Sequence, residues 1–368
     1  MKLILKQAAL TFVSFATLYL IVLGVSFAVL PAPAQNGVLD AQAAGGTLYM
    51  TSPKYVFLGR GTLSSADRKV IMVGASNIGN GFRATMVQPL MLCSKVSNLG
   101  VGGTNISQVN QIIDLVHEVQ DGATRKLNTF VIGVWYGMFV DSEVRYNDAD
   151  RNRGDTDIDI ERYRYGFARR TANGSVNVVP ARWLDAGVAA IRPILLLEKA
   201  ARTMRSMADR LTGRSRDHTD AEREAAVMTD KQKQDALVYW LQGMGSNDQI
   251  SQEQVALLIR TVDRLLNAGE QVVLADLPIP AWHRDASPYY PAYQEALQAI
   301  VQQFDGRRAF KFMRMSDLDG NEDYSDEVHA KPHLAKVWSA RLVEILNPLV
   351  CNGDSERSPI ASSGSVVR

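Results

Sequence analysis

The stretch Lys69–Phe82, KVIMVGASNIGNGF, decides how the rest of the chain is interpreted. Its first half is a continuous apolar run ending at Gly74, which is typical of a buried β-strand. Its second half places Ser76 among glycines and asparagines, where the chain is expected to turn from the strand into a helix. Such a turn lies at the carboxyl end of a strand, where open α/β sheets bind their ligands.

Further apolar runs predict strands that follow the first one. They are KVSNLG at 95–100, NTFVIGVW at 128–135, EQVVLADLP at 270–278 and RAFKFMRM at 308–315. Segments with the 3.6-residue periodicity of amphipathic helices lie between or after them, at 105–122, 251–269 and 331–346. Strands that alternate with helices predict an α/β fold with a parallel sheet and helices on both faces.

Local signals mark the ends of these helices. Gly122 and Gly269 are expected to stop the first two helices, because glycine readily adopts the left-handed conformation at a helix end. Ser251 and Gln254 have the spacing of a capping box. Pro332 is expected in the first turn of the third helix, where its missing N–H costs nothing.

The composition limits the classes of function. The chain has 368 residues, 46% hydrophobic and 21% charged, enough for one large globular domain with attachments. Its formal net charge of +1 gives no electrostatic argument for nucleic-acid binding. The two cysteines, Cys93 and Cys351, are too few for a disulfide framework, and no CxxC metal motif is present. One disulfide between them is an open alternative in an oxidising compartment.

The N-terminus has the properties of a membrane anchor. Lys2 and Lys6 precede a run without charged residues that extends to Asp40, and Ala8–Leu30 is long enough to cross the hydrocarbon core of a bilayer. The positive-inside rule then predicts a cytoplasmic N-terminus and an exported, periplasmic or extracytoplasmic remainder. Small residues in the APAQ stretch that follows leave cleavage as a signal peptide open.

These signals divide the chain into parts. Residues 1–34 are expected to form the anchor, 35–66 a linker, 67–350 the α/β domain and 351–368 a flexible tail. An insertion at 141–245 interrupts the alternation of strands and helices. Its charged first part is expected to be a solvated excursion, and its amphipathic part near 183–211 an extra helical layer on the domain. A lid, a partner-binding helix and an interfacial helix on the membrane are the alternatives for that part.

The glycine-rich turn has three interpretations. A Walker-type phosphate loop requires a lysine after its second glycine, and Asn80 stands there instead. A dinucleotide turn would use Gly74, Gly79 and Gly81, but this loose pattern is weak evidence and no Tyr-x-x-x-Lys pair accompanies it, so we expect no cofactor. The third interpretation makes Ser76 a nucleophile. The N-terminus of the following helix would favour an oxyanion there, and the serine needs an adjacent general base.

The base expected for Ser76 is His329. Asp326 precedes it by three residues in DYSDEVHAKPH, so the carboxylate can meet one ring nitrogen when the loop folds back. His333 is a substitute base. A metal site made from Asp326 and both histidines is also conceivable, but Pro332 opposes the helical geometry that it would need, and we expect no metal.

The combination resembles the SGNH/GDSL hydrolase superfamily, whose members carry short blocks in this order. GASN with Ser76 corresponds to the nucleophile block, NLGVGGTN with Gly103 to the block of the oxyanion glycine, and Asp326-x-x-His329 to the last block. The resemblance covers roughly residues 69–140 and 250–350. It implies a flavodoxin-like, three-layer α/β/α fold, with Ser76 as nucleophile, His329 as base and Asp326 as the acid that orients it.

Two departures from the family pattern concern the site. Ala75 replaces the aspartate before the serine, and Trp135 stands where the third block has an asparagine that donates to the oxyanion. Loss of one such donor typically costs about 10²–10³ in rate. Asn77 or Tyr136 is expected to supply a replacement side-chain donor. Ordinary packing at the sheet edge is the alternative for Tyr136.

Within the superfamily, the chain is similar to membrane-anchored, exported relatives that act on envelope polymers, such as alginate O-acetylation proteins and the D-alanyl transfer protein of teichoic acid synthesis. The resemblance implies a serine-dependent esterase or O-acyltransferase acting on an acylated polysaccharide or glycan, with a membrane-bound acyl-donor protein as a partner. The alternative is a catalytically degenerate member that binds glycan or a membrane partner.

Overall fold

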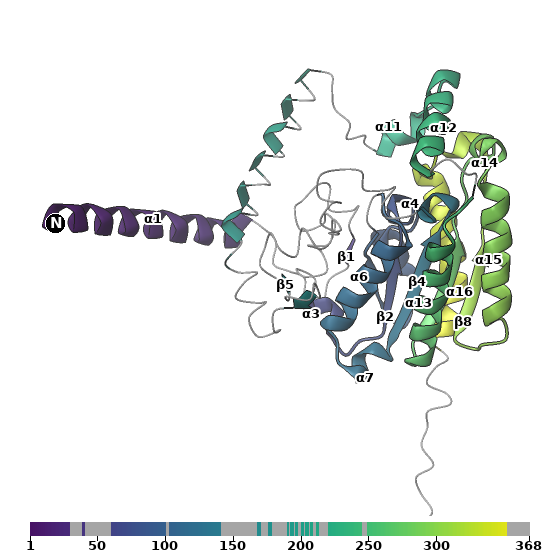
Figure 1. Cartoon of the computed structure of the whole chain (residues 1–368), viewed down its shortest axis with the longest axis horizontal. Coiled ribbons are helices and arrows are strands. Elements are labelled where there is room, and N and C mark those ends of the chain that lie inside the picture. Colours follow the sequence, from purple (N-terminus) through teal and green to yellow (C-terminus); the bar gives the residue numbers. More distant parts are fainter. Residues whose placement is uncertain are drawn as a thin grey trace, which may run out of the picture.

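The computed structural model describes residues 1–29, 39–40, 60–100, 103–140, 168–170, 176–178, 220–244 and 249–351, together with helical positions between 190 and 212. An α/β domain contains most of them. The N-terminal helix α1 (Lys2–Val29) projects away from this domain (Figure 1). It is long and apolar enough to cross a membrane, as the sequence predicts.

A parallel sheet forms the centre of the domain, and its strands lie at the places predicted from the apolar runs. They are β2 (Lys69–Val73), β3 (Lys95–Asn98), β4 (Asn128–Val134), β7 (Gln271–Asp276) and β8 (Phe310–Arg314). Their order is β3-β2-β4-β7-β8, and the short strand β1 (Leu39–Asp40) pairs with β3 at the edge. All these pairings are parallel, which confirms the α/β class.

Helices connect and cover the strands. They are α3 (Arg60–Leu63), α4 (Ser76–Gly81), α5 (Ala84–Val87), α6 (Ile106–Glu118), α7 (Gly122–Arg125), α11 (Asp220–Ala225), α12 (Asp230–Met244), α13 (Gln252–Asn267), α14 (Ala281–Ala286), α15 (Tyr290–Phe304) and α16 (Pro332–Cys351). Single 3₁₀ turns lie at Gln88–Leu90, Tyr136–Met138 and Asn321–Asp323. α6 packs beside α13 on one face of the sheet, and α16 packs beside α4 and α5 on the other (Figure 1). Every residue of β2 and β4 is buried between these layers.

Most of the predicted helix ends are confirmed. Pro332 is the first residue of α16, and Gly269 follows α13 with φ of +83°. The hydroxyl of Ser251 caps α13 by accepting a hydrogen bond from the Gln254 backbone N–H at 3.3 Å. The Gln254 side chain does not complete a capping box, because its oxygen accepts from the backbone N–H of Ser107 on α6 at 2.9 Å. The cap therefore also ties two neighbouring helices together.

The predicted stop at Gly122 is wrong. α6 already ends at Glu118, and Gly122 is the first residue of the separate short helix α7. The reason is local, because the Asp121 carboxylate accepts a hydrogen bond from the Thr124 backbone N–H at 2.7 Å and so starts a new helix.

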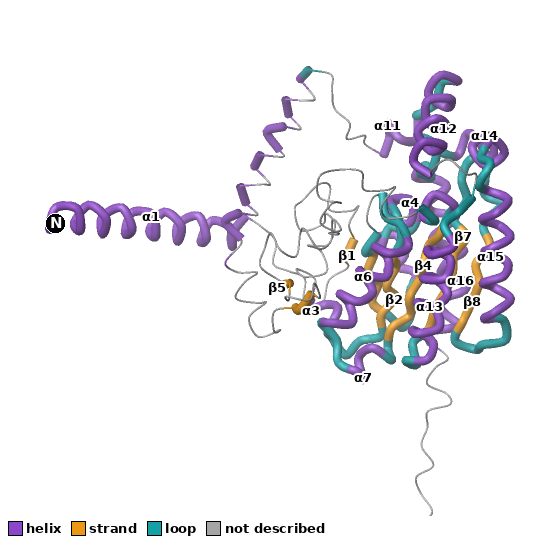
Figure 2. The backbone as a smooth tube through the Cα atoms, in the orientation of Figure 1, coloured by secondary structure: helices purple, strands orange, loops and turns teal. Residues whose placement is uncertain are grey.

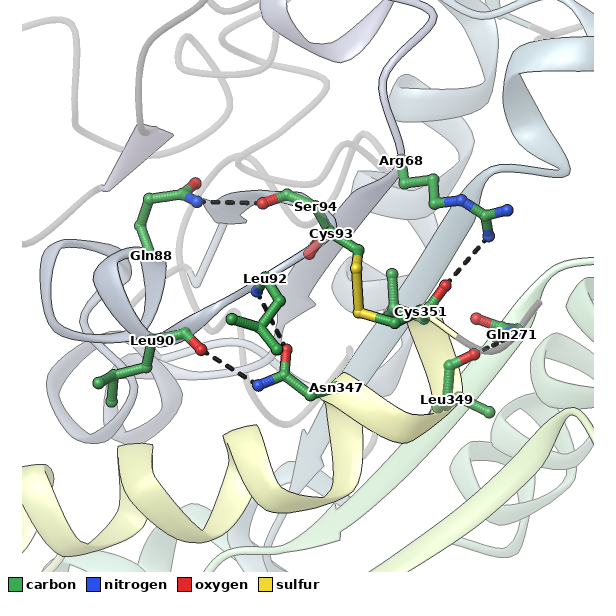
Figure 3. Close-up of a disulfide and its surroundings, with 11 residues drawn as sticks. Arg68, Gln88, Leu90, Leu92, Cys93, Ser94, Gln271, Asn347, Leu349 and Cys351 are labelled. Atoms are coloured by element: carbon green, nitrogen blue, oxygen red, sulfur yellow. Dashed lines mark hydrogen bonds between the residues drawn. A yellow bond between two sulfur atoms is a disulfide. The ribbon is translucent and has the colours of Figure 1, made fainter. Parts of the chain in front are cut away.

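A disulfide joins Cys93, which precedes β3, to Cys351 at the end of α16 (Figure 3). The disulfide that the sequence analysis left open is therefore present. The side chain of Asn347 strengthens the same junction, since it donates to the Leu90 carbonyl at 3.1 Å and accepts from the Leu92 backbone N–H at 3.2 Å. The junction closes the domain at the amino-terminal edge of the sheet.

Parts of the predicted organisation lie outside the described residues. These are 30–34 of the anchor, most of the linker 35–66, residues 141–167 of the charged excursion and 352–368 of the tail. Within the linker, β1 and α3 are described. Within the excursion, β5 (Ala168–Arg170) pairs with β6 (Val176–Val178) in an antiparallel ladder.

The second half of the insertion differs from the predicted helical layer. The described positions between 190 and 212 are helical, and Leu196 packs against the core, but the other large apolar side chains described there are exposed. α11 and α12 instead lie over the end of the sheet where α4 and α14 are found (Figure 2). The last part of the insertion therefore borders the carboxyl edge of the strands.

Candidate functional site

The turn between β2 and α4 holds Ser76, as the sequence predicts. Gly74 allows this turn to sit close to the neighbouring strand, because a side chain there would lie 2.7 Å from the Gly133 carbonyl oxygen of β4. Ser76 is the first residue of α4 and is half-buried. Its hydroxyl therefore lies at the carboxyl edge of the two central strands.

Three predicted side chains come together at this edge. His329 Nε2 lies 2.8 Å from Ser76 Oγ, and His329 Nδ1 lies 2.7 Å from Asp326 Oδ2. Because a carboxylate only accepts, Nδ1 carries the ring hydrogen and Nε2 accepts from the serine hydroxyl. This is the arrangement in which a serine is activated by a base that a carboxylate orients.

The loop that carries Asp326 and His329 is folded by the same carboxylate. Asp326 Oδ1 accepts from the backbone N–H groups of Val328 at 3.0 Å and His329 at 2.8 Å. Burial opposes ionisation of Asp326, but the hydrogen bonds from the His329 ring and from these N–H groups keep its pKa below the ordinary value. The carboxylate is therefore charged at neutral pH and can stabilise an imidazolium.

A second histidine, His283 on α14, supports this loop and was not assigned from the sequence. It is fully buried, with Nδ1 2.7 Å from the Glu327 carbonyl oxygen and Nε2 2.6 Å from the Tyr136 hydroxyl. Since the carbonyl only accepts, Nδ1 donates to it and the tyrosine donates to Nε2. Burial lowers the pKa of His283 to about 4, so the ring is neutral. The sequence offers one signal that His283 belongs to the site, which is its position shortly after the end of β7.

Tyr136 is not free to act as the replacement oxyanion donor. Its only hydroxyl hydrogen is given to His283, and the residue is buried beneath the site. Burial also raises its pKa, which keeps the phenol protonated. The alternative expected for Tyr136, packing at the end of the strand, agrees better with this position.

Trp135 and Asn77 are two buried donors that stand beside the Ser76 turn. Trp135 packs edge-on against Trp240 of α12 with ring centroids 4.6 Å apart. Asn77 Oδ1 accepts from the Ile78 backbone N–H at 3.1 Å. Among the described residues, neither the Trp135 indole N–H nor the Asn77 side-chain N–H₂ has a hydrogen-bond partner. Buried donors usually have an acceptor, so two unpartnered donors next to the Ser76 turn are unusual.

Gly103 lies in the loop between β3 and α6, at the same carboxyl edge as Ser76. It is exposed and has φ of +72°, a conformation that favours glycine. The preceding part of the loop is held to α4, because Asn98 donates to the Phe82 carbonyl at 2.7 Å and accepts from the Gly100 N–H at 2.9 Å.

A cavity of about 940 Å³ opens beside His329 and Asp326. Its opposite wall comes from α11, α12 and the turn between them, including Arg223, Met228 and Tyr239. Such a volume is in the range of sites for whole small ligands. The insertion thus contributes a wall to the site.

Polar contacts hold α11 in this position. Arg83 pairs with Asp220 through two bonds of 2.6 and 2.8 Å, and Arg223 donates to the side chain of Asn80 at 2.9 Å. These tethers join the insertion to α4 and the chain that follows it.

His333 belongs to the same set of tethers and is not a substitute base for Ser76. Its ring lies between Glu224 of α11 and Asp323, with Nε2 3.0 Å from Asp323 Oδ1. Although burial opposes the charge, the bonds to these two carboxylates raise the pKa of His333. No cluster of metal-ligating side chains is found among the residues that the structure describes.

No protein-family model matches the chain, and no curated protein matches it either. The geometry of Ser76, His329 and Asp326 is therefore the basis for interpreting the site.

Proposed function

We propose that the chain is an exported, membrane-anchored serine esterase or O-acyltransferase of the SGNH type that acts on an acylated envelope glycan. The observation that carries the proposal is the continuous hydrogen-bonded series from Asp326 through His329 to Ser76, which joins residues 253 positions apart. In a solvated loop of unrelated residues, nothing would require the ring to face the hydroxyl in this tautomer.

The geometry supports a two-step mechanism. Ser76 Oγ attacks the carbonyl carbon of an ester while His329 Nε2 takes the hydroxyl proton, and Asp326 stabilises the resulting imidazolium. The tetrahedral intermediate collapses, the C–O bond to the alcohol breaks, and His329 returns the proton to the leaving oxygen. The acyl-serine then passes its group to water, in an esterase, or to a sugar hydroxyl, in a transferase.

The oxyanion of this intermediate requires donors. We assign this role to the backbone N–H groups of Ser76 and Gly103, together with the unpaired side-chain donors of Asn77 and Trp135. Trp135 stands at the position of the family's asparagine, and its indole N–H supplies one hydrogen as that amide would.

The strand order supports an SGNH-type fold. β3-β2-β4-β7-β8 is the flavodoxin-like order 2-1-3-4-5 in chain sequence. The connections leave β2 and β4 in opposite directions, and such sheets bind their ligands at this switch point. Ser76 follows β2 and Trp135 follows β4, so both flank it.

Two observations support export. The apolar helix α1 carries Lys2 and Lys6 in its first two turns, which favours a cytoplasmic N-terminus with the domain on the other side. The disulfide between Cys93 and Cys351 is typical of an oxidising compartment. We propose a single-pass anchor that holds the domain in the periplasm or outside the cell, within reach of a membrane-bound acyl-donor protein.

The cavity supports a glycan as substrate. A volume of about 940 Å³ is far more than a short acyl group fills, and the exposed ring of Tyr239 lines it beside the polar side chains of Arg223 and Gln232. An aromatic surface with a few polar groups suits a sugar, which presents both apolar C–H faces and hydroxyls.

An active-serine probe tests the proposal. The purified full-length protein is treated with a fluorophosphonate, and the modified residue is identified by mass spectrometry. Labelling at Ser76 is expected, with loss of labelling in Ser76→Ala and normal labelling in Ser94→Ala, which changes a serine at the opposite edge of the sheet. A folded protein that remains unlabelled would refute the catalytic role. Analysis of the acyl group after addition of glycan then separates esterase from transferase.

A second candidate is a non-catalytic member of the fold that binds glycan or a membrane partner. The tryptophan at the position of the donor asparagine favours it, since Trp135 is packed into an aromatic cluster. Glycan binding by a protein that reacts neither with the probe nor with p-nitrophenyl acetate would decide for this candidate.

A further inference from the structure

We propose that the helical positions between 190 and 212, hereafter the flanking helix, lie in the headgroup region of the same bilayer that α1 spans. This placement rests on the proposed membrane anchor. It assigns a lipid surface to a part of the insertion that does not line the cavity beside His329.

The flanking helix exposes one apolar face. Its exposed side chains are Ile194 at 48%, Leu197 at 64%, Met204 at 65%, Met207 at 60% and Leu211 at 89%. These positions are separated by intervals of three, four or seven residues, which places them on one side of a helix. Such a face on a protein surface marks an interaction with a membrane or a partner.

The flanking helix begins against the carboxyl end of α1. Arg192 donates to the Ser26 carbonyl at 3.0 Å and lies 4.4 Å from the centroid of the Phe27 ring. The Tyr19 hydroxyl donates to the Ala190 carbonyl at 2.6 Å. Both Arg192 and Ser26 are buried in this junction, so the flanking helix and α1 are joined by specific contacts.

The position of the junction along α1 agrees with a membrane surface. Lys6 and Ser26 are separated by about 30 Å of helix, which is the thickness of the hydrocarbon core. When Lys6 lies at one surface, Ser26 therefore lies at the other. Tyr19 is about 10 Å deeper along the helix, and interfacial helices bury their apolar face about 5–10 Å into the acyl boundary.

The flanking helix stands apart from the sheet of the α/β domain and is basic. In Figures 1 and 2 the flanking helix rises from the end of α1 and runs across its direction, apart from the sheet of the α/β domain. Residues 190–212 contain five basic and two acidic side chains, a net charge of +3. A basic amphipathic helix binds anionic lipid surfaces through both its apolar face and its charge.

Site-directed fluorescence tests the placement. The full-length protein is reconstituted into vesicles of phosphatidylcholine and phosphatidylglycerol, and an environment-sensitive thiol dye is attached to Leu197→Cys, Met204→Cys or Leu211→Cys. The native cysteines are paired with each other and do not react. We expect blue-shifted emission and at least a twofold loss of intensity when nitroxide lipids labelled near the headgroup are added.

Two matched reporters make the outcome decisive. A dye at Arg205→Cys, outside the apolar face, is expected to stay water-like, and a dye at Leu18→Cys in α1 is expected to be quenched by a nitroxide at the bilayer centre. If Leu18 is quenched but the dyes at 197, 204 and 211 behave like the one at 205, the anchor stands and the flanking helix is not on the lipid. A water-like signal at Leu18 would overturn the anchor and this placement together, without affecting the chemistry of Ser76.

Discussion

The ring of His283 donates a hydrogen bond of 2.7 Å from Nδ1 to the carbonyl oxygen of Glu327. Glu327 follows Asp326 directly, so this bond fixes the backbone of the loop that presents Asp326 and His329. On its other side the ring accepts from the Tyr136 hydroxyl at 2.6 Å, which connects the loop to the end of β4. A buried histidine thus holds the loop against the sheet without touching Ser76.

We expect His283→Ala to act through this loop. Removing the ring leaves the Glu327 carbonyl and the Tyr136 hydroxyl without partners, and the lost positioning should lower kcat by about 10–100-fold, as a small misplacement of catalytic groups does. KM should change little, because His283 does not line the cavity. Steady-state kinetics on a p-nitrophenyl ester measures both. An unchanged kcat in a folded variant would show that the loop does not need this support.

His283 also predicts a pH dependence of stability. Its pKa is lowered from 6.5 to about 4, so between these values the unfolded chain binds a proton that the folded chain does not. The folded state therefore gains stability as pH rises through this window, on the order of 3 kcal/mol for the full shift, and loses it as pH falls towards 4. Denaturant unfolding at a series of pH values measures this, with His283→Gln as the variant in which the histidine's part of the slope disappears.

At the contact of α11 with α16 we expect the opposite pH dependence of stability. His333 has a raised pKa because it lies between Asp323 and Glu224. The stability that protonated His333 contributes is therefore complete at pH values below its pKa in the unfolded chain. It is lost as pH rises through the higher pKa that His333 has in the folded protein. We expect hydrogen exchange of α11 to become faster above neutral pH, and His333→Ala to remove that change. Exchange in α6, on the other face of the sheet, is the internal control.

Trp135→Phe tests the unpaired indole. Phenylalanine keeps most of the packing against Trp240 but removes the N–H, so a role as oxyanion donor predicts a fall in kcat of about 10²–10³ with little change in KM. Trp240→Phe is the matched control, because it alters the same cluster from the side of α12. Equal and small effects of both substitutions would assign the two tryptophans to packing alone.

Removing the disulfide should destabilise the domain without affecting chemistry. Cys93→Ser/Cys351→Ser frees the end of α16 from the start of β3, across 258 residues of chain. Loss of a native disulfide typically costs about 2–5 kcal/mol, largely by releasing the unfolded chain. Urea unfolding with and without reductant measures the cost. Probe labelling of Ser76 in the folded variant should be unaltered, because the junction lies at the other edge of the sheet.

The strands of this protein were predictable because parallel strands buried on both faces require continuous apolar runs, and such runs can be recognised in the sequence alone. All five predicted strands are found at those runs. The pair of Asp326 and His329 was predictable for a similar reason, since three residues of loop are enough to bring a carboxylate to a ring. Ser76 could be named because the end of a buried strand is a defined place in an α/β sheet.

Other features were decided by tertiary structure, because they join segments whose proximity no local pattern records. The hydrogen of Tyr136 goes to His283, 147 residues away, and nothing around either residue indicates the other. The wall of the cavity comes from α11 and α12, to which the sequence analysis assigned no role. Periodicity states which residues must be buried, whereas the neighbour against which each is buried depends on how the layers pack in three dimensions.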